Sequence, residues 1–104
     1  MSLKKLLWRV SLLLLLTGVL GAQTPALDAL NGGRYEEALR LYQLQVAESP
    51  ESVEALLGVS QALSGLERYE EALEWAEKSY ARDPDSVGVL SQRAAVLSRL
   101  TPRE

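Results

Sequence analysis

The chain is 104 residues long and carries 11 basic and 14 acidic side chains, but it contains no Cys, His or Phe. Without Cys it has no disulfide, thiol nucleophile, Cys-bound zinc or lipid-modified cysteine, and without His it lacks the commonest general base and metal ligand. This composition disfavours metal and acyl-transfer enzymes, leads us to expect no cofactor, and leaves room for one domain at most.

The N-terminal segment has three sections, which are basic, apolar and small in turn. Three basic side chains lie within residues 1–9, an apolar run follows over residues 10–20, and Gly21 and Ala22 are small. The run is shorter than the roughly 20 residues that span a membrane, so we expect residues 1–22 to be a signal peptide cleaved after Ala22. The alternative is an uncleaved signal anchor in which Arg9 snorkels. Both interpretations export the domain, which would be periplasmic, extracellular or held at the membrane by this segment alone.

The residues after this segment are acidic as a group. They keep 8 of the 11 basic side chains and all 14 acidic ones, so their net charge is about −6. Binding to nucleic acid depends on Lys and Arg that neutralise phosphates, and we therefore expect no nucleic-acid partner. A protein or peptide partner of neutral or basic character fits this charge better.

The rest of the sequence repeats itself with a period of 34. GRYEEAL at residues 33–39 returns as ERYEEAL at 67–73, and residues 31–66 match residues 65–100 at 14 of 36 positions. Apolar side chains within each period recur at helical spacing, with glycine and proline between the stripes. The pattern predicts helices at about 25–31, 34–48, 52–64, 67–82 and 86–100, and we expect Gly65, like residues 31–33, to provide a positive φ after a helix.

One full unit begins at Val53. Its first helix carries a large, an apolar, a small and a bulky residue in turn. Its second helix carries Tyr-x-x-Ala, and a proline closes the unit. These residues are Leu56, Val59, Ser60 and Leu63, then Tyr69, Ala72 and Pro84. This arrangement resembles the tetratricopeptide repeat, a 34-residue helix-turn-helix unit. The residues that carry the resemblance, and that we expect to define the repeat structurally, are Tyr35, Ala38, Pro50, Leu56, Ser60, Tyr69, Ala72 and Pro84.

The resemblance implies an all-α fold for residues 23–104. Antiparallel helix-turn-helix repeats would stack as a short right-handed α-solenoid of about two and a half units, and residues 86–100 would be a capping helix. We expect Leu90, Ala94 and Leu97 to face the helix at 67–82, and Arg93 and Arg99 to face water. So short an array is marginal in stability, which leaves open a homo-oligomer formed through an end face.

Candidate catalytic groups are weak. The pairs Glu36/Glu37 and Glu70/Glu71 are helix neighbours that diverge, and so are Lys78 and Ser79, which excludes a metal site and a Ser-Lys nucleophile at these positions. Trp75 lies off the apolar stripe and is a candidate exposed contact. We therefore expect no enzyme, no catalytic residue and no metal.

In tetratricopeptide arrays the first helices line a concave groove, and the resemblance places partner-binding residues there. Family members that clamp a C-terminal carboxylate use Lys and Asn in such a groove, and neither occurs at these positions. We accordingly expect an exported, non-catalytic scaffold or adaptor for a protein partner. The alternative is a structural or assembly subunit that self-associates through its end helices. The expected groove residues are Glu54, Leu57, Gln61, Ser64, Ser91, Ala95 and Ser98.

Overall fold

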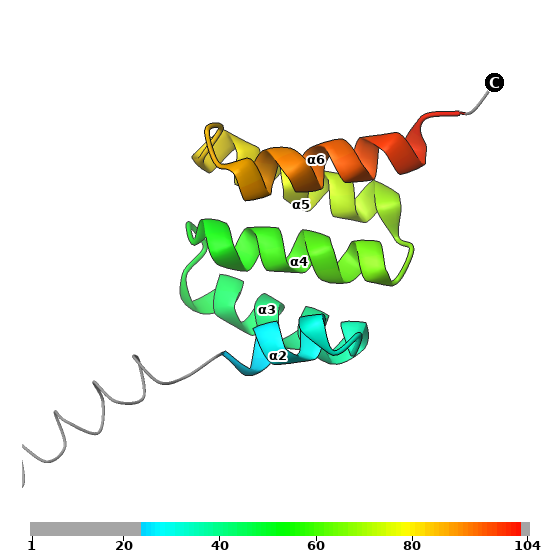
Figure 1. Cartoon of the computed structure of the whole chain (residues 1–104). Helices are drawn as coiled ribbons and strands as arrows, with labels where there is room; N and C mark the ends of the chain where they lie inside the picture. Colours follow the sequence, from blue (N-terminus) through cyan, green and yellow to red (C-terminus); the bar gives the residue numbers. More distant parts are fainter. Residues whose placement is uncertain (1–23, 103–104) are drawn as a thin grey trace, which may run out of the picture.

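The structure, a computed structural model, describes residues 24–102, and in this part of the chain it contains helices and no strand. The helices lie side by side in a stack, with α4 between the α2–α3 and α5–α6 pairs (Figure 1). This arrangement confirms the all-α solenoid, and each predicted helix boundary lies within two residues of the observed one. The predicted signal peptide or anchor, residues 1–22, lies outside the described residues. The helices are α2 (Pro25–Asn31), α3 (Tyr35–Glu48), α4 (Val53–Gly65), α5 (Tyr69–Arg82) and α6 (Val87–Leu100).

The first helix of each unit begins after a hydroxyl side chain. Thr24, Ser52 and Ser86 precede α2, α4 and α6, and each side-chain oxygen accepts a hydrogen bond from the amide three residues later at 3.3 Å. Such a cap satisfies one of the amides that the first turn leaves without an intrahelical partner. The same residue type thus fixes where every first helix starts.

The second helices begin differently. Arg34 and Arg68 precede α3 and α5 without a side-chain cap, and each binds the glutamate three residues on, at 3.0 Å for Arg34–Glu37 and 2.7 Å for Arg68–Glu71. The hydrogen bond from Arg68 lowers the pKa of the Glu71 carboxyl. Both pairs are exposed, so they add little to stability.

The tight turns inside the units adopt a left-handed backbone at one repeated position. Gly33 has φ of 76° and Glu67, 34 residues later, has φ of 61°. The prediction that Gly65 serves this purpose is wrong, because Gly65 is the last residue of α4. A Cβ built there would lie 2.3 Å from the Tyr35 ring, so Gly65 instead makes room for that side chain.

The core is centred on α4, which contacts every other described helix. The buried residues of α4 include Leu56, Val59 and Leu63 and the smaller Ala55 and Ala62, and α4 packs against α3 on one side and α5 on the other. Small residues on α3 and α5 allow this close approach, since Ala38, Ala72 and Ala76 are fully buried. Burial of these side chains from both sides is the main source of stability.

The orientation of α6 corrects one prediction. Its buried residues are Val89 and Val96, which face α5, whereas Leu90, Ala94 and Leu97 are exposed. In the preceding unit the corresponding first-helix positions are covered by the second helix that follows, and among the described residues no helix follows α6.

Arg99 of α6 is exposed, as predicted, whereas Arg93 is only half-exposed, and the guanidinium of each contacts α5. The guanidinium of Arg93 binds Glu77 of α5 at 2.7 Å and lies 4.7 Å from the centre of the Tyr80 ring. The guanidinium of Arg99 lies over the ring of Tyr69, 5.8 Å from its centre. Both arginines therefore attach α6 to α5.

Candidate functional site

A groove of about 390 Å³ runs across the first helices of the three units. Residues from the C-terminal halves of α4 and α6 form most of its surface, and the end of α2 and the first residues of α3 and α5 complete it. Helix stacking therefore builds the groove, and no loop contributes to it. The lining residues are Leu30, Tyr35, Gln61, Ser64, Gly65, Tyr69, Gln92, Ala95 and Arg99.

Two tyrosines at the same repeat position lie along the groove in different surroundings. Tyr35 fills the space that Gly65 leaves empty, at the end of α4. The residue that corresponds to Gly65 in the next unit is Arg99, and its guanidinium covers Tyr69. At one end of the groove the Tyr35 ring thus lies against the backbone of Gly65. At the other end the Arg99 guanidinium lies over the Tyr69 ring.

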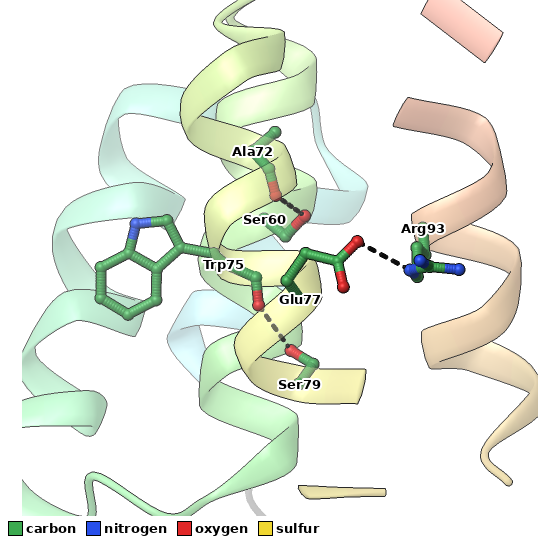
Figure 2. A network of polar contacts seen from close by, with 6 residues as sticks. All are labelled: Ser60, Ala72, Trp75, Glu77, Ser79 and Arg93. Atoms are coloured by element: carbon green, nitrogen blue, oxygen red, sulfur yellow. Dashed lines mark hydrogen bonds and ion pairs between the residues drawn. The ribbon is translucent and has the colours of Figure 1, made fainter. Parts of the chain in front are cut away.

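Hydrogen bonds fix the polar side chains between these ends. The side-chain amide of Gln92 donates to the hydroxyl oxygens of Ser60 at 3.1 Å and Ser64 at 2.9 Å. Ser60 in turn donates to the main-chain oxygen of Ala72 at 2.7 Å, within the polar network of Figure 2. This chain links α6, α4 and α5, and Ser60 is fully buried. These hydrogen bonds therefore hold the Gln92 amide and the Ser64 hydroxyl in place within the groove.

Arg99 is the one charged side chain among the nine residues that line the groove. The others are aromatic, aliphatic or neutral amides and hydroxyls, so the local charge is positive although the chain has a net charge of −3. The expectation of a neutral or basic partner came from the overall charge and stays a prediction, because the overall charge does not describe the groove itself. An anionic group is the complement of Arg99.

A family model described as the tetratricopeptide repeat matches residues 25–87, more than half of the chain. The chain belongs to the tetratricopeptide repeat family. No curated protein matches it. Tetratricopeptide repeats suggest a scaffold for protein–protein interaction, and the family is typically non-catalytic.

The tetratricopeptide pattern accounts for the residues that were expected to define the repeat. Ala38, Leu56, Ser60 and Ala72 are buried. Pro50 and Pro84 lie in exposed turns that follow α3 and α5, and Tyr35 and Tyr69 are half-buried beside the groove. The alanines and Ser60 thus set the spacing of the helices, and the tyrosines belong both to the frame and to the site.

Three of the seven groove residues expected from the tetratricopeptide resemblance line the groove. Gln61, Ser64 and Ala95 do so. Glu54 and Leu57 lie nearer the start of α4 and Ser91 is exposed on α6, and none of the three lines the groove. The hydroxyl of Ser98 donates to the main-chain oxygen of Ala95 at 2.8 Å, within its own helix.

The sequence prediction missed Gln92 and Arg99, although a signal for both exists. They occupy the positions of Gly58 and Gly65 in the preceding tetratricopeptide unit. When a long polar side chain replaces glycine in an otherwise regular repeat, that side chain is expected to make a contact that the preceding unit lacks. Here Gln92 bonds to α4 and Arg99 covers Tyr69.

Lys78 and Ser79, neighbours on α5, both contact Trp75. The hydroxyl of Ser79 donates to the main-chain oxygen of Trp75 at 3.0 Å, and the ammonium of Lys78 lies 4.0 Å from the centre of the Trp75 ring (Figure 2 draws the first contact). Lys78 is thus engaged with the indole, as a cation over an aromatic ring. Trp75 is half-buried against the core, which corrects its prediction as an exposed contact.

Among residues 24–102, no group of His, Cys, Asp or Glu side chains is placed so that it could hold a metal ion. Within the same range, every helix is too short or too polar to cross a membrane.

Proposed function

We propose that this protein is an exported, non-catalytic scaffold that binds an extended segment of another protein in the groove across α2, α4 and α6. The observation that carries the proposal is the composition of the groove: one cation, two aromatic rings and several neutral hydrogen-bonding groups, fixed on a helical frame. These are the groups by which a peptide is bound, and none is arranged as an acid, base or nucleophile.

The charge of the groove defines the segment further. Arg99 pairs with a carboxylate, either an Asp or Glu side chain or a chain terminus. The Gln61 amide and the Ser64 hydroxyl are suited to the main-chain groups of an extended peptide. Tyr35 and Tyr69 line the groove and add aromatic surface for its apolar side chains. The bound segment is thus acidic and extended, with at least one apolar residue.

Peptide selection tests this proposal directly. A displayed library of random ten-residue peptides is selected on the purified protein, and the enriched peptides are measured by calorimetry. We expect enrichment of Asp, Glu or a free C-terminus, and an affinity at least about tenfold lower for Arg99→Glu, which corresponds to about 1.4 kcal/mol.

The matched control is Arg40→Glu, which makes the same change of charge at an exposed position of α3 outside the groove. It should leave the affinity within about twofold. Selection without acidic enrichment, or equal losses in the two variants, would contradict the proposal.

Export is supported by the order of basic, apolar and small residues within residues 1–22. Mass spectrometry of the protein recovered outside the cytoplasm checks it, and the expected mature N-terminus is Gln23. Recovery only from the cytoplasm would contradict export but would leave the groove proposal standing.

A further inference from the structure

An apolar row runs along the outer face of α6. Val87, Leu90, Ala94 and Leu97 are spaced by three, four and three residues, and all four are exposed. The exposed fractions are 78% for Val87, 43% for Leu90 and 36% for Leu97. In Figure 1, α6 lies at one end of the stack, with α5 behind it and no other helix over it. The row is therefore a helix-packing surface that no described residue covers.

The preceding unit shows what such a row does. Val53, Leu56, Ser60 and Leu63 have the same spacing on α4, and Leu56 and Leu63 are only 4% and 2% exposed because α5 packs over them. Spacing by three and four residues is also the pattern by which two helices pair along a common seam. The α6 row is thus suited to a second helix.

A further helix of the usual stack is not the best occupant. The second helix of a unit also covers the position between the leucines, which is Val59 in α4, fully buried. In α6 that position is Arg93, and its burial would remove a guanidinium from water at a high cost in free energy. A helix that covers only Val87, Leu90, Ala94 and Leu97, and leaves Arg93 beside the contact in water, avoids this cost.

The charges beside the row favour a second copy of this chain. Arg93 and Glu77 form an ion pair of 2.7 Å, so these two charges beside the row cancel, and α6 itself carries no carboxylate. The second helices instead begin with pairs of glutamates, Glu36/Glu37 on α3 and Glu70/Glu71 on α5. Two copies that meet through α6 therefore avoid the like-charge repulsion that other faces of this acidic chain would cause.

We propose that two copies associate through the α6 rows about a two-fold axis, with Ala94 of each copy near the axis and the leucines on either side. A two-fold interface places the same patch on both partners, and the small side chain of Ala94 lets the two helices approach closely. One 14-residue helix from each copy buries an area at the low end for specific interfaces, so the dimer forms at high concentration and dissociates on dilution.

Sedimentation equilibrium of the exported protein, over a range of concentrations, tests the dimer. The double variant Leu90→Gln/Leu97→Gln should raise the dissociation constant at least tenfold. The control Leu27→Gln/Leu44→Gln changes two exposed leucines on α2 and α3 and should leave the constant within twofold. Circular dichroism confirms that both variants stay helical. A monomer at every concentration, or equal effects of the two variants, would overturn the proposal.

Disulfide trapping tests the same contact independently of affinity. The chain has no cysteine, so Ala94→Cys introduces a single thiol in the middle of the row. Mild oxidation should give a disulfide-linked dimer much faster than with the control Ala47→Cys, at an exposed position on α3. Equal rates would overturn the proposal. Arg99→Glu should leave the dimer intact, which separates this proposal from peptide binding in the groove.

Discussion

α4 and α6 hold the same position in consecutive repeats, and the comparison separates two roles of a first helix. Both pack backwards onto the preceding second helix through small or β-branched residues, Ala55 and Ala62 on α4, Val89 and Val96 on α6, all buried. Their forward faces differ, because α5 covers that of α4 and no described residue covers that of α6. The energetic value of a repeat position is therefore set by the neighbouring helix as much as by the residue itself.

The largest contrast is expected between two leucines at one repeat position. Leu63→Ala removes a buried side chain and should lower the free energy of unfolding by about 2–5 kcal/mol. Leu97→Ala should lower it by about 1 kcal/mol or less, because Leu97 keeps 36% of its surface exposed on α6. Urea unfolding followed by circular dichroism measures both values, at a concentration low enough to keep the protein monomeric. Equal losses would show that the α6 face is buried in solution even in the monomer.

The second contrast concerns two glycines. A Cβ at Gly58 would lie 2.3 Å from the ring of Tyr42, whereas a Cβ at Gly88 would lie at ordinary contact distances, 3.5 Å from Leu57 and 3.8 Å from the Ser86 hydroxyl. Gly58→Ala should therefore destabilise the protein by about 1–3 kcal/mol through overpacking. Gly88→Ala should stabilise it by about 0.5–1 kcal/mol, since alanine favours the helix. Thermal unfolding distinguishes the two, and stabilisation by both variants would mean that Tyr42 can move aside without cost.

A third contrast exchanges serine and alanine between the two helices. Ser60→Ala leaves the main-chain oxygen of Ala72 without its buried side-chain donor and removes one acceptor from Gln92, at a cost of about 1–2 kcal/mol. Ala94→Ser, at the corresponding exposed position, should be neutral within about 0.5 kcal/mol. Urea midpoints give both values. A neutral Ser60→Ala would show that the hydrogen bonds around Ser60 add nothing to the packing.

The smallest contrast depends on pH. Burial raises the pKa of the Tyr42 hydroxyl, and the nearby Glu54 carboxylate raises it further, whereas the corresponding residue under α6 is Ala76, which does not ionise. The folded chain therefore holds the Tyr42 proton more tightly than the unfolded chain. The stability that this provides is complete below pH 10 and is lost as the pH rises above that value.

The measurement is the free energy of unfolding at pH 9 and pH 11. Tyr42→Phe should lose less stability between these values than the natural sequence does. Glu54→Gln should have the same effect to a smaller extent, since it removes the second cause of the raised pKa. An unchanged alkaline loss in both variants would show that Tyr42 does not contribute to it.

The sequence predicts the frame of this protein better than its surfaces. The period of 34 indicates the order of the helices. The prolines at 50 and 84 mark where the second helices end, and the buried alanines at 38 and 72 allow adjacent helices to pack closely. The orientation of Leu90 was predicted wrongly. The repeat shows that Leu90 occupies the same position as Leu56, but it does not show whether another helix covers that position.

The groove was predicted only in part for a related physical reason. Gln61, Ser64 and Ala95 follow from the face of the first helix alone. The role of Arg99 is harder to predict. Arg99 occupies the position of Gly65 in the preceding unit, and only the structure shows that its long side chain reaches Tyr69. Pairwise contacts of this kind depend on the distance between the helices, which periodicity does not contain.

The turn at Glu67 has a consequence for how the array can change. A residue with a side chain occupies there the left-handed backbone that glycine occupies at position 33, and this costs on the order of 1 kcal/mol. Glycine at position 67 would recover this energy without changing the core or the groove. Relief of the constraint in this one loop can offset a mildly harmful substitution elsewhere, so the binding surfaces of such a small scaffold can vary without loss of the fold.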